Sequence, residues 1–181
     1  MIAHDSYQHL QPIHEAPTSF ITKYVFSTDH KVIAKQFLWA GLLFLAFGGT
    51  LAMMIRWQWG YPGQPMPGFG VIGPATYNQI FTMHGLIMIF FAITPMMIGA
   101  FGNLCIPLMV GARDMAFPKL NMLSFWTFVL ALLCIVGSFL VHLGSGSAGW
   151  TTYPPLSTQI GSPGLGQTLV VMAIFATGSA T

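Results

Sequence analysis

Four stretches of almost uninterrupted apolar residues divide the chain. They cover about residues 36–56, 76–109, 123–143 and 167–181, and the fourth is still unfinished at the last residue. About 20 apolar residues cross the hydrocarbon core of a bilayer as an α-helix. Each stretch is apolar on all faces, as expected for a helix surrounded by lipid and other helices. The pattern predicts an all-α, polytopic transmembrane helix bundle, with three full spans and the start of a fourth within residues 35–181.

The second stretch is longer than a bilayer requires. As a helix it extends about 50 Å, against a hydrocarbon thickness of about 30 Å. It must tilt, protrude or bend, and Pro95 near its middle is the expected position of a bend. The connecting residues 60–73 and 144–166 are rich in glycine, proline and serine, which predicts irregular loops.

Composition excludes two broad classes of protein. Only 6% of the residues are charged, whereas a soluble domain carries about a quarter, so the surface must meet lipid or other apolar helices. The formal net charge is +2, and no run of basic residues occurs, so nucleic acid is not an expected partner.

The positive charges predict an orientation in the membrane. If the helices alternate in direction, Lys23, Lys31, Lys35, Arg113 and Lys119 lie on one side, and Arg56 alone lies on the other. Positive residues favour the inner side of a membrane. We therefore expect the N-terminal tail, residues 1–34, to lie on the cytoplasmic or matrix side.

His84 is the first candidate for chemistry, because it lies within the second apolar stretch. Ionisable residues inside membrane spans are rare and tend to be functional, and a neutral imidazole is a good ligand for haem iron. A histidine that only forms a hydrogen bond between helices is an equally weighted alternative. The adjacent Gly85 suits either the close approach of a flat macrocycle or plain helix packing.

Arg56 ends the first span on the same outer side as His84. One interpretation is an arginine whose side chain reaches out to the membrane surface. The other is a fixed cation for a carbonyl or anionic group of a cofactor.

A polar set lies on the inner side, consisting of Asn103, Asp114 and Asn121. A loop carboxylate of this kind is usually just solvated. Alternatively, Asp114 collects protons at the membrane surface, and the asparagines hold a chain of water molecules beyond it.

Several segments are specific enough to compare with known families. They are Ser27–Lys31, Met54–Arg56, Tyr77–Asn78, Thr82–Gly85, Gly99–Asn103, Pro107–Leu108, Gly111–Pro118, Asn121, Ser124–Trp126 and Gly149–Leu156. These segments resemble subunit I of the haem–copper oxidases, in particular of cytochrome c oxidases. The resemblance covers about residues 27–156, and the Asp-Met-Ala-Phe-Pro and Trp-Thr-x-Tyr-Pro-Pro-Leu segments are highly specific.

This resemblance implies a place in a bundle of about a dozen helices and a role for each candidate residue. His84 would be one of two axial ligands of the low-spin haem, which is haem a in cytochrome c oxidases, and Arg56 would contact the haem formyl group. Asp114 would form the mouth of the D proton pathway, with Asn103 and Asn121 lining it. The remaining ligands, including those of a high-spin haem and a copper ion, would lie beyond Thr181.

The implied activity is that of a terminal respiratory oxidase. Electrons would pass from cytochrome c, through the copper of subunit II, to haem a and on to a haem–copper centre that reduces oxygen to water while protons are pumped. The implied partners are the rest of subunit I, subunits II and III, cytochrome c and membrane lipids, in a bacterial cytoplasmic or mitochondrial inner membrane. Alternatives are a quinol oxidase subunit I, a multi-pass transporter without haem, and a non-catalytic scaffold.

Three positions depart from the family pattern. Arg113 stands where the family usually has proline, and Met122 stands where it has a second asparagine. The first places a cation beside the expected proton mouth, and the second removes a polar group from the pathway. In the fourth span, Phe175 stands near the place of a family histidine.

Overall fold

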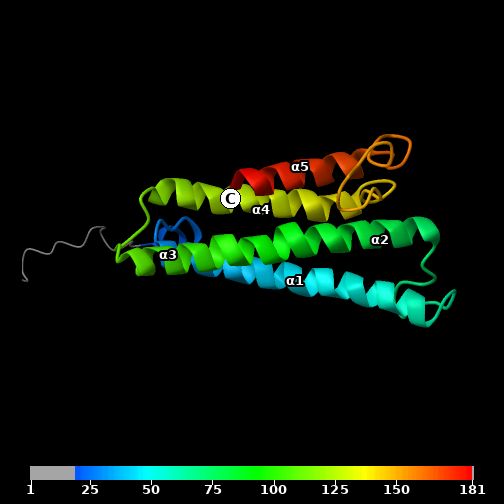
Figure 1. Ribbon diagram of the computed structural model, residues 1–181, viewed down its shortest axis with the longest axis horizontal. Coiled ribbons are helices and arrows are strands. Elements are labelled where there is room, and N and C mark those ends of the chain that lie inside the picture. The colour runs from blue at the N-terminus through cyan, green and yellow to red at the C-terminus, as the bar shows by residue number, and fades with distance from the viewer. Residues whose placement is uncertain (1–18, 181) are drawn as a thin grey trace, which may run out of the picture.

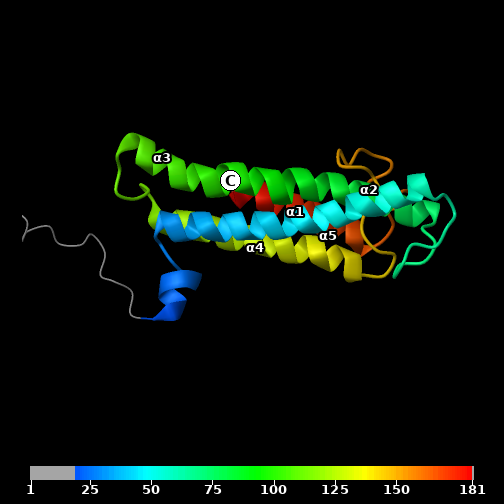
Figure 2. The same cartoon turned by 90° about the horizontal axis from the view of Figure 1, so that it is seen from below.

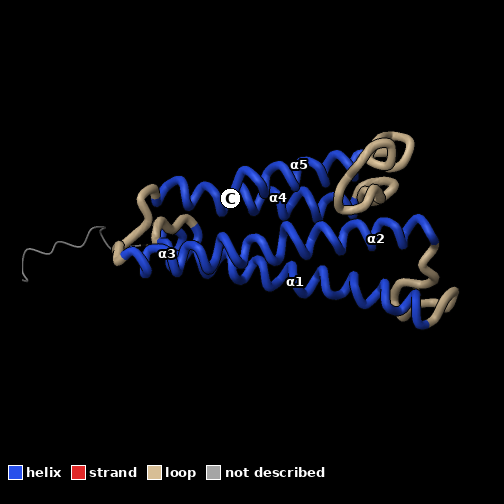
Figure 3. Tube along the Cα trace, in the orientation of Figure 1, coloured by secondary structure: helices blue, strands red, loops and turns tan. Residues whose placement is uncertain are grey.

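The structure is a computed structural model that describes residues 19–180, and every regular element in this range is helical. Figures 1 and 3 show these helices running side by side. The elements are η1 (Ile21–Val25), α1 (His30–Gly60), α2 (Pro74–Leu86), η2 (Ile87–Ile93), η3 (Pro95–Gly102), α3 (Asn103–Val110), α4 (Pro118–Leu140) and α5 (Leu165–Ala180). The prediction of an all-α polytopic bundle is confirmed, and the first 18 residues of the N-terminal tail lie outside the described residues.

Three helices are long and apolar enough to cross a membrane. They are α1, the continuous helix Pro74–Val110 and α4, with 31, 37 and 23 residues. The helix α5 is shorter, with 16 residues. Both α1 and α4 begin several residues before the apolar stretches that predicted them.

Local chemistry explains the early starts of α1 and α4. The side chain of Asp29 accepts a hydrogen bond from the backbone N–H of Lys31 at 2.8 Å, so it caps α1 before its apolar residues begin. Pro118 is the first residue of α4, where its missing N–H costs no hydrogen bond. Polar first turns therefore extend both helices beyond the apolar pattern.

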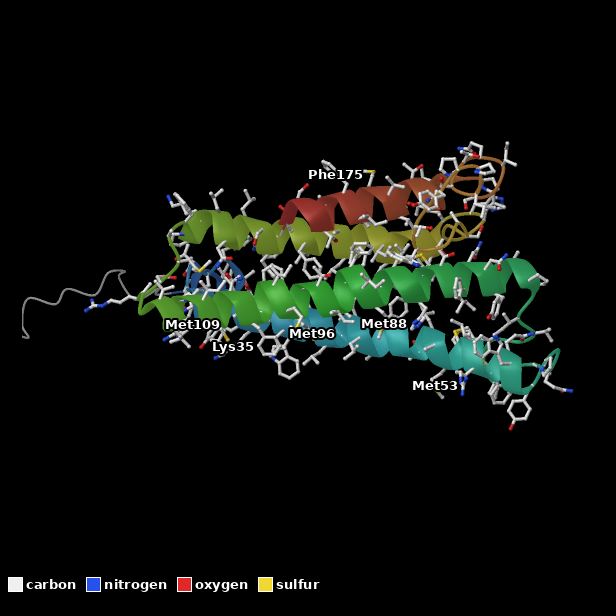
Figure 4. The ribbon with its side chains drawn as sticks, viewed as in Figure 1. Lys35, Met53, Met88, Met96, Met109 and Phe175 are labelled. Carbon is white, nitrogen blue, oxygen red and sulfur yellow. The ribbon has the colours of Figure 1, made fainter. Side chains whose placement is uncertain are left out.

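The helices form two neighbouring pairs. The helix α1 packs along the helix of residues 74–110, and α4 packs along α5. Figure 1 shows both pairs, and Figure 2 shows the bundle from the side of α1, with α5 largely behind the other helices. Successive long helices run in opposite directions, so the start of α1, the end of α3 and the start of α4 meet at one end of the bundle. Lys35, labelled in Figure 4, lies near this end, and Arg56 lies near the other end of α1.

The long second helix contains widened, π-type turns on both sides of Pro95. These turns form η2 and η3. The backbone N–H and the side-chain hydroxyl of Thr94 both donate to the carbonyl oxygen of Ile89, five residues earlier. Proline lacks an N–H group and crowds the preceding turn of an α-helix, and wider turns relieve that crowding. The chain therefore continues through Pro95 as a helix.

Aromatic side chains form the centre of the packing between the two pairs. The ring of Phe37 in α1 meets Phe125 edge-on at 5.1 Å between centroids, and it lies 5.5 Å from Phe128 in α4. Phe91 of η2 stacks on Phe128 at 6.4 Å and lies 6.1 Å from Phe44 of α1. Phe37, Phe91 and Phe128 are buried. These rings join α1, the second helix and α4 into one core.

Glycines allow α1 and the second helix to approach each other closely. A side-chain carbon built on Gly41 would lie 2.5 Å from Cγ of Met96, and one on Gly99 would lie 2.6 Å from the ring of Phe37. Gly49, by contrast, has nothing within 4 Å of that position. Small residues are typical of helix contacts in membranes.

Candidate functional site

His84 lies near the end of α2, and its side chain faces α1. The Nδ1 atom is 2.9 Å from the carbonyl oxygen of Gly48, and the contact is partly buried. A carbonyl oxygen only accepts hydrogen bonds, so Nδ1 must carry the proton. The structure thus shows the hydrogen bond between helices that was one of the two interpretations of His84.

This hydrogen bond also prepares the other ring nitrogen for a metal. With the proton on Nδ1, the neutral imidazole has its free lone pair on Nε2. Metal-bound histidines usually donate their second N–H to a carbonyl or carboxylate, which fixes the tautomer and strengthens the ligand. The donor chemistry of His84 therefore fits one axial bond to haem iron, and the two interpretations are compatible.

Gly48 makes the contact with His84 possible. A side-chain carbon at Gly48 would lie 2.8 Å from Sδ of Met88 and 3.1 Å from Cγ2 of Ile87. Both distances are shorter than ordinary van der Waals contacts of 3.4–4 Å. An added side chain therefore requires either that Met88 and Ile87 move aside or that α1 moves back from η2, and the second response would carry the carbonyl oxygen of residue 48 away from the imidazole.

Gly85 contacts the connector between α4 and α5. A side-chain carbon at Gly85 would lie 3.3 Å from Cβ of Trp150. On the same face of α2, the hydroxyl oxygen of Thr82 accepts a hydrogen bond from the backbone N–H of Gly149 at 2.9 Å. The small size of Gly85 is therefore used by a tryptophan of this chain, and its approach to a macrocycle stays a prediction.

Arg56 is exposed and lies apart from His84. Its guanidinium carbon is 5.7 Å from the centre of the Trp59 ring, a favourable cation–π contact. Arg56 is eight residues after Gly48, the residue of α1 that His84 contacts, and therefore lies about 12 Å farther along α1. Met53, one turn earlier, points away from the other helices in Figure 4. This outward face agrees with a surface arginine and leaves a haem contact as a prediction.

At the other end of the bundle, Asp114 pairs with His30. The Oδ1 atom of Asp114 is 2.9 Å from Nδ1 of His30, and it accepts the backbone N–H of Met115 at 2.8 Å. The His30 side chain is only 3% exposed, whereas that of Asp114 is 20% exposed. The carboxylate of Asp114 therefore joins the loop before α4 to the start of α1.

Asn103 and Asn121 line the same cavity of about 360 Å³ beside this pair. The Nδ2 atom of Asn103 donates to the carbonyl oxygen of Gly99 at 2.7 Å. Within the described part of the chain, Nδ2 of Asn121 is buried without a hydrogen-bond partner. Buried polar groups of this kind are usually satisfied by internal water. The structure brings the three predicted inner residues into one neighbourhood.

The departures from the family pattern lie at the edge of this neighbourhood. Arg113 is exposed beside Asp114. Met122 packs against the apolar core, so it contributes no polar group to the cavity. Phe175 projects outward from α5 in Figure 4 and is 76% exposed.

Among residues 19–180, no group of three or more histidine, cysteine, aspartate or glutamate side chains could hold a metal ion. His84 therefore stays a single predicted ligand.

Sequence reasoning did not predict the contacts of three residues at or next to the candidate sites. They are His30, Gly48 and Thr82. His30 stands in the Ser-Thr-Asp-His-Lys segment, but its partner Asp114 is 84 residues away. Gly48 and Thr82 act through a backbone carbonyl and a hydroxyl, neither of which produces a sequence pattern.

Fold and site together define a multi-pass α-helical membrane protein with a histidine inside one of its spans. Residues 32–181 match the family described as cytochrome c and quinol oxidase polypeptide I, and the chain belongs to this family.

Curated relatives agree with this assignment. The chain is 44% identical over 156 residues to the alternative cytochrome c oxidase subunit 1 of Bradyrhizobium diazoefficiens, which covers 86% of this chain and 26% of that protein. It is 36% identical over 180 residues to the probable cytochrome c oxidase subunit 1-alpha of Streptomyces avermitilis, covering 99% of this chain and 30% of that protein. It is 39% identical over 170 residues to cytochrome c oxidase subunit 1 of Thermostichus vulcanus, covering 94% and 29%. The chain thus spans less than a third of the length of these relatives.

Proposed function

We propose that this chain is the N-terminal part of subunit I of a terminal respiratory oxidase. The complete protein would transfer electrons from cytochrome c, through a low-spin haem a, to a haem–copper centre that reduces oxygen to water and drives proton translocation. The observation that carries the proposal is His84, whose Nδ1 bonds the Gly48 carbonyl oxygen at 2.9 Å and leaves Nε2 for iron.

In this proposal the chain supplies half of one haem site. Bound haem iron supplies one-electron redox chemistry. His84 would hold the iron through Nε2, and the carbonyl oxygen of Gly48 would keep the imidazole in the tautomer that this bond requires. Arg56 and Gly85 are the further residues proposed to contact the haem, while the second ligand of its iron, a high-spin haem and a copper ion would belong to the rest of the protein.

The inner site would admit protons. A carboxylate at the membrane surface can exchange protons with water, and Asp114 is partly exposed. Asn103 and Asn121 line the adjoining cavity, where their amides can hold water molecules for onward transfer. Arg113 places a positive charge beside this mouth, and Met122 packs against the apolar core and supplies no polar group to the pathway.

Cytochrome c is favoured over quinol as the electron donor, because the relatives described above are named cytochrome c oxidases. A quinol oxidase remains the second candidate, because the family description includes it. Copper-binding cysteines in the partner subunit II would support cytochrome c, and turnover with a quinol alone would support the other donor. Subunit III and membrane lipids complete the proposed assembly.

The proposed location is a bacterial cytoplasmic or mitochondrial inner membrane, with the N-terminus on the cytoplasmic or matrix side. The basic residues near the start of α1 and around the loop before α4 support this orientation. A reporter fused before α1 should be active only on that side.

The decisive experiment is His84→Ala in the full-length subunit within its assembled complex. The variant should lose the absorption and paramagnetic-resonance signals of the low-spin haem. Intact signals would remove His84 as a ligand. Absence of haem from the purified wild-type complex would favour a transporter or a scaffold instead.

A further inference from the structure

We infer that the connector between α4 and α5 positions the turn of α2 that carries His84, through a stripe formed by Gln79, Thr82 and Gly85. This inference rests on the proposed haem site. These residues are spaced three apart, so they lie along one face of α2. Each contacts the connector of residues 141–164.

The three contacts of the stripe differ in kind. The Nε2 atom of Gln79 donates to the carbonyl oxygen of Leu143 at 2.8 Å. The hydroxyl oxygen of Thr82 accepts the N–H of Gly149 at 2.9 Å, and Gly85 leaves room for Trp150. The contacts thus extend over two turns of α2 and end next to His84.

Thr82 is the central member of the stripe. Its side chain is buried, with a residue exposure of 1%, and it meets a residue 67 positions away in the chain. Gly149 has φ of +79°, a conformation that most other residues adopt only with strain. The turn of Gly149 and Trp150 therefore needs glycine at 149. In this turn the backbone N–H of Gly149 points at the Thr82 hydroxyl, which accepts it.

The connector is itself tied together, so it can act as a support. The N–H of Ser147 donates to Oγ of Ser162 at 3.1 Å, and the hydroxyl of Ser147 donates to the carbonyl oxygen of Gly161 at 3.1 Å. These bonds join the two ends of the loop, whose coils are visible above α2 in Figure 1.

His84 is consequently held from two directions. Its own imidazole bonds α1 through Gly48, and the neighbouring face of its turn bonds the connector. Two fixed supports leave the turn little freedom to rotate about the helix axis. Thr82 and the Gly149 turn are therefore positioning groups for the axial ligand rather than ligands themselves.

The test compares Thr82→Val with Thr82→Ser in the full-length subunit within its complex. Valine keeps the shape of threonine but removes the acceptor, whereas serine keeps the hydroxyl. The first measurement is amide hydrogen exchange of a peptide containing Gly149. Exchange should become about tenfold faster or more in Thr82→Val, because a lost buried hydrogen bond is large enough for such a change, and it should stay near wild type in Thr82→Ser.

The second measurement is the low-spin haem. Its paramagnetic-resonance g-values and midpoint potential should shift in Thr82→Val and return to wild type in Thr82→Ser. Thr127→Val on α4 is the matched control, because that exposed hydroxyl bonds only the carbonyl oxygen of Leu123 in its own helix. It should change neither measurement.

The possible results separate the inference from the proposed function. Unchanged exchange in Thr82→Val would refute the contact itself, and faster exchange with unchanged haem signals would refute its positioning role. Equal shifts in Thr82→Val and Thr82→Ser would assign the effect to packing and overturn the inference. A wild-type complex that contains no haem would refute the proposed function, and the positioning role would fall with it.

Discussion

Gly48→Ala tests the contact on which the haem assignment depends. The added carbon would lie 2.8 Å from Sδ of Met88, at least 0.6 Å closer than an ordinary contact of 3.4 Å. If α1 moves back from η2 by this difference, the distance from the residue 48 carbonyl oxygen to Nδ1 of His84 grows from 2.9 Å to about 3.5 Å. A hydrogen bond is hardly effective at that length.

The energetic cost of this change can be estimated. Overpacking a helix contact costs about 1–3 kcal/mol, and the lost hydrogen bond costs about 1 kcal/mol. The higher helix propensity of alanine returns about 1 kcal/mol. The net destabilisation is therefore about 1–3 kcal/mol, which should lower the temperature at which the complex loses its low-spin haem absorbance.

The redox effect has a definite sign. An N–H bonded to a carbonyl makes the imidazole a stronger electron donor and favours the ferric state. Loss of that bond should therefore raise the midpoint potential of the haem. The rise should be about 40 mV for each kcal/mol by which the hydrogen bond had stabilised the ferric state over the ferrous state. Spectroelectrochemical titration of the purified complex measures this shift.

Two matched variants make the Gly48 experiment decisive. Gly49→Ala adds the same carbon one residue later, where nothing lies within 4 Å. It should leave the potential nearly unchanged and raise stability by the roughly 1 kcal/mol of alanine's helix propensity. Met88→Ala combined with Gly48→Ala removes the colliding sulfur and should restore most of the wild-type potential. If Gly48→Ala behaves like Gly49→Ala, the proposed tautomer control of His84 is wrong.

Three further predictions concern other parts of the chain. Asp114→Asn should slow turnover or lower the number of protons pumped per electron in reconstituted vesicles, and an unchanged ratio and rate would remove this carboxylate from the pathway. Arg56→Gln should cost under about 1 kcal/mol of stability, because the contact of Arg56 with Trp59 is exposed. If Arg56 also contacts the haem, the substitution should shift the absorption band of the low-spin haem. An unshifted band would leave Arg56 only its surface role. Gly99→Ala should destabilise the bundle by about 1–3 kcal/mol, because the new carbon would lie 2.6 Å from the ring of Phe37; normal thermal stability would show that the ring can move aside.

The apolar pattern predicted the helical class because membrane spans carry their signal in every residue. It placed the helix ends less well, since caps and prolines extend helices without adding apolar residues. The π-type turns around Pro95 were not predicted either. In these turns the backbone N–H of Thr94 bonds the carbonyl oxygen of Ile89, five residues earlier instead of the four of an α-helix. Whether a turn spans four or five residues depends on packing rather than on composition.

The candidate residues were predictable only as single positions. His84 and Asp114 attract attention because charges and imidazoles are rare in this chain. Their partners depend on how distant segments meet: Gly48 is 36 residues from His84, and His30 is 84 residues from Asp114. Periodicity within one helix carries no information about such pairs, so three-dimensional packing had to supply them.

The helix α1 connects the two candidate sites. Its first residue, His30, bonds Asp114, and Gly48 bonds His84. These positions are 18 residues apart, or about 27 Å along the helix, close to the thickness of the hydrocarbon core. Between them Phe37 packs into the aromatic core against Gly99. A rigid α1 therefore fixes the Asp114 carboxylate and the His84 imidazole relative to each other, and a displacement of this helix would alter both sites together.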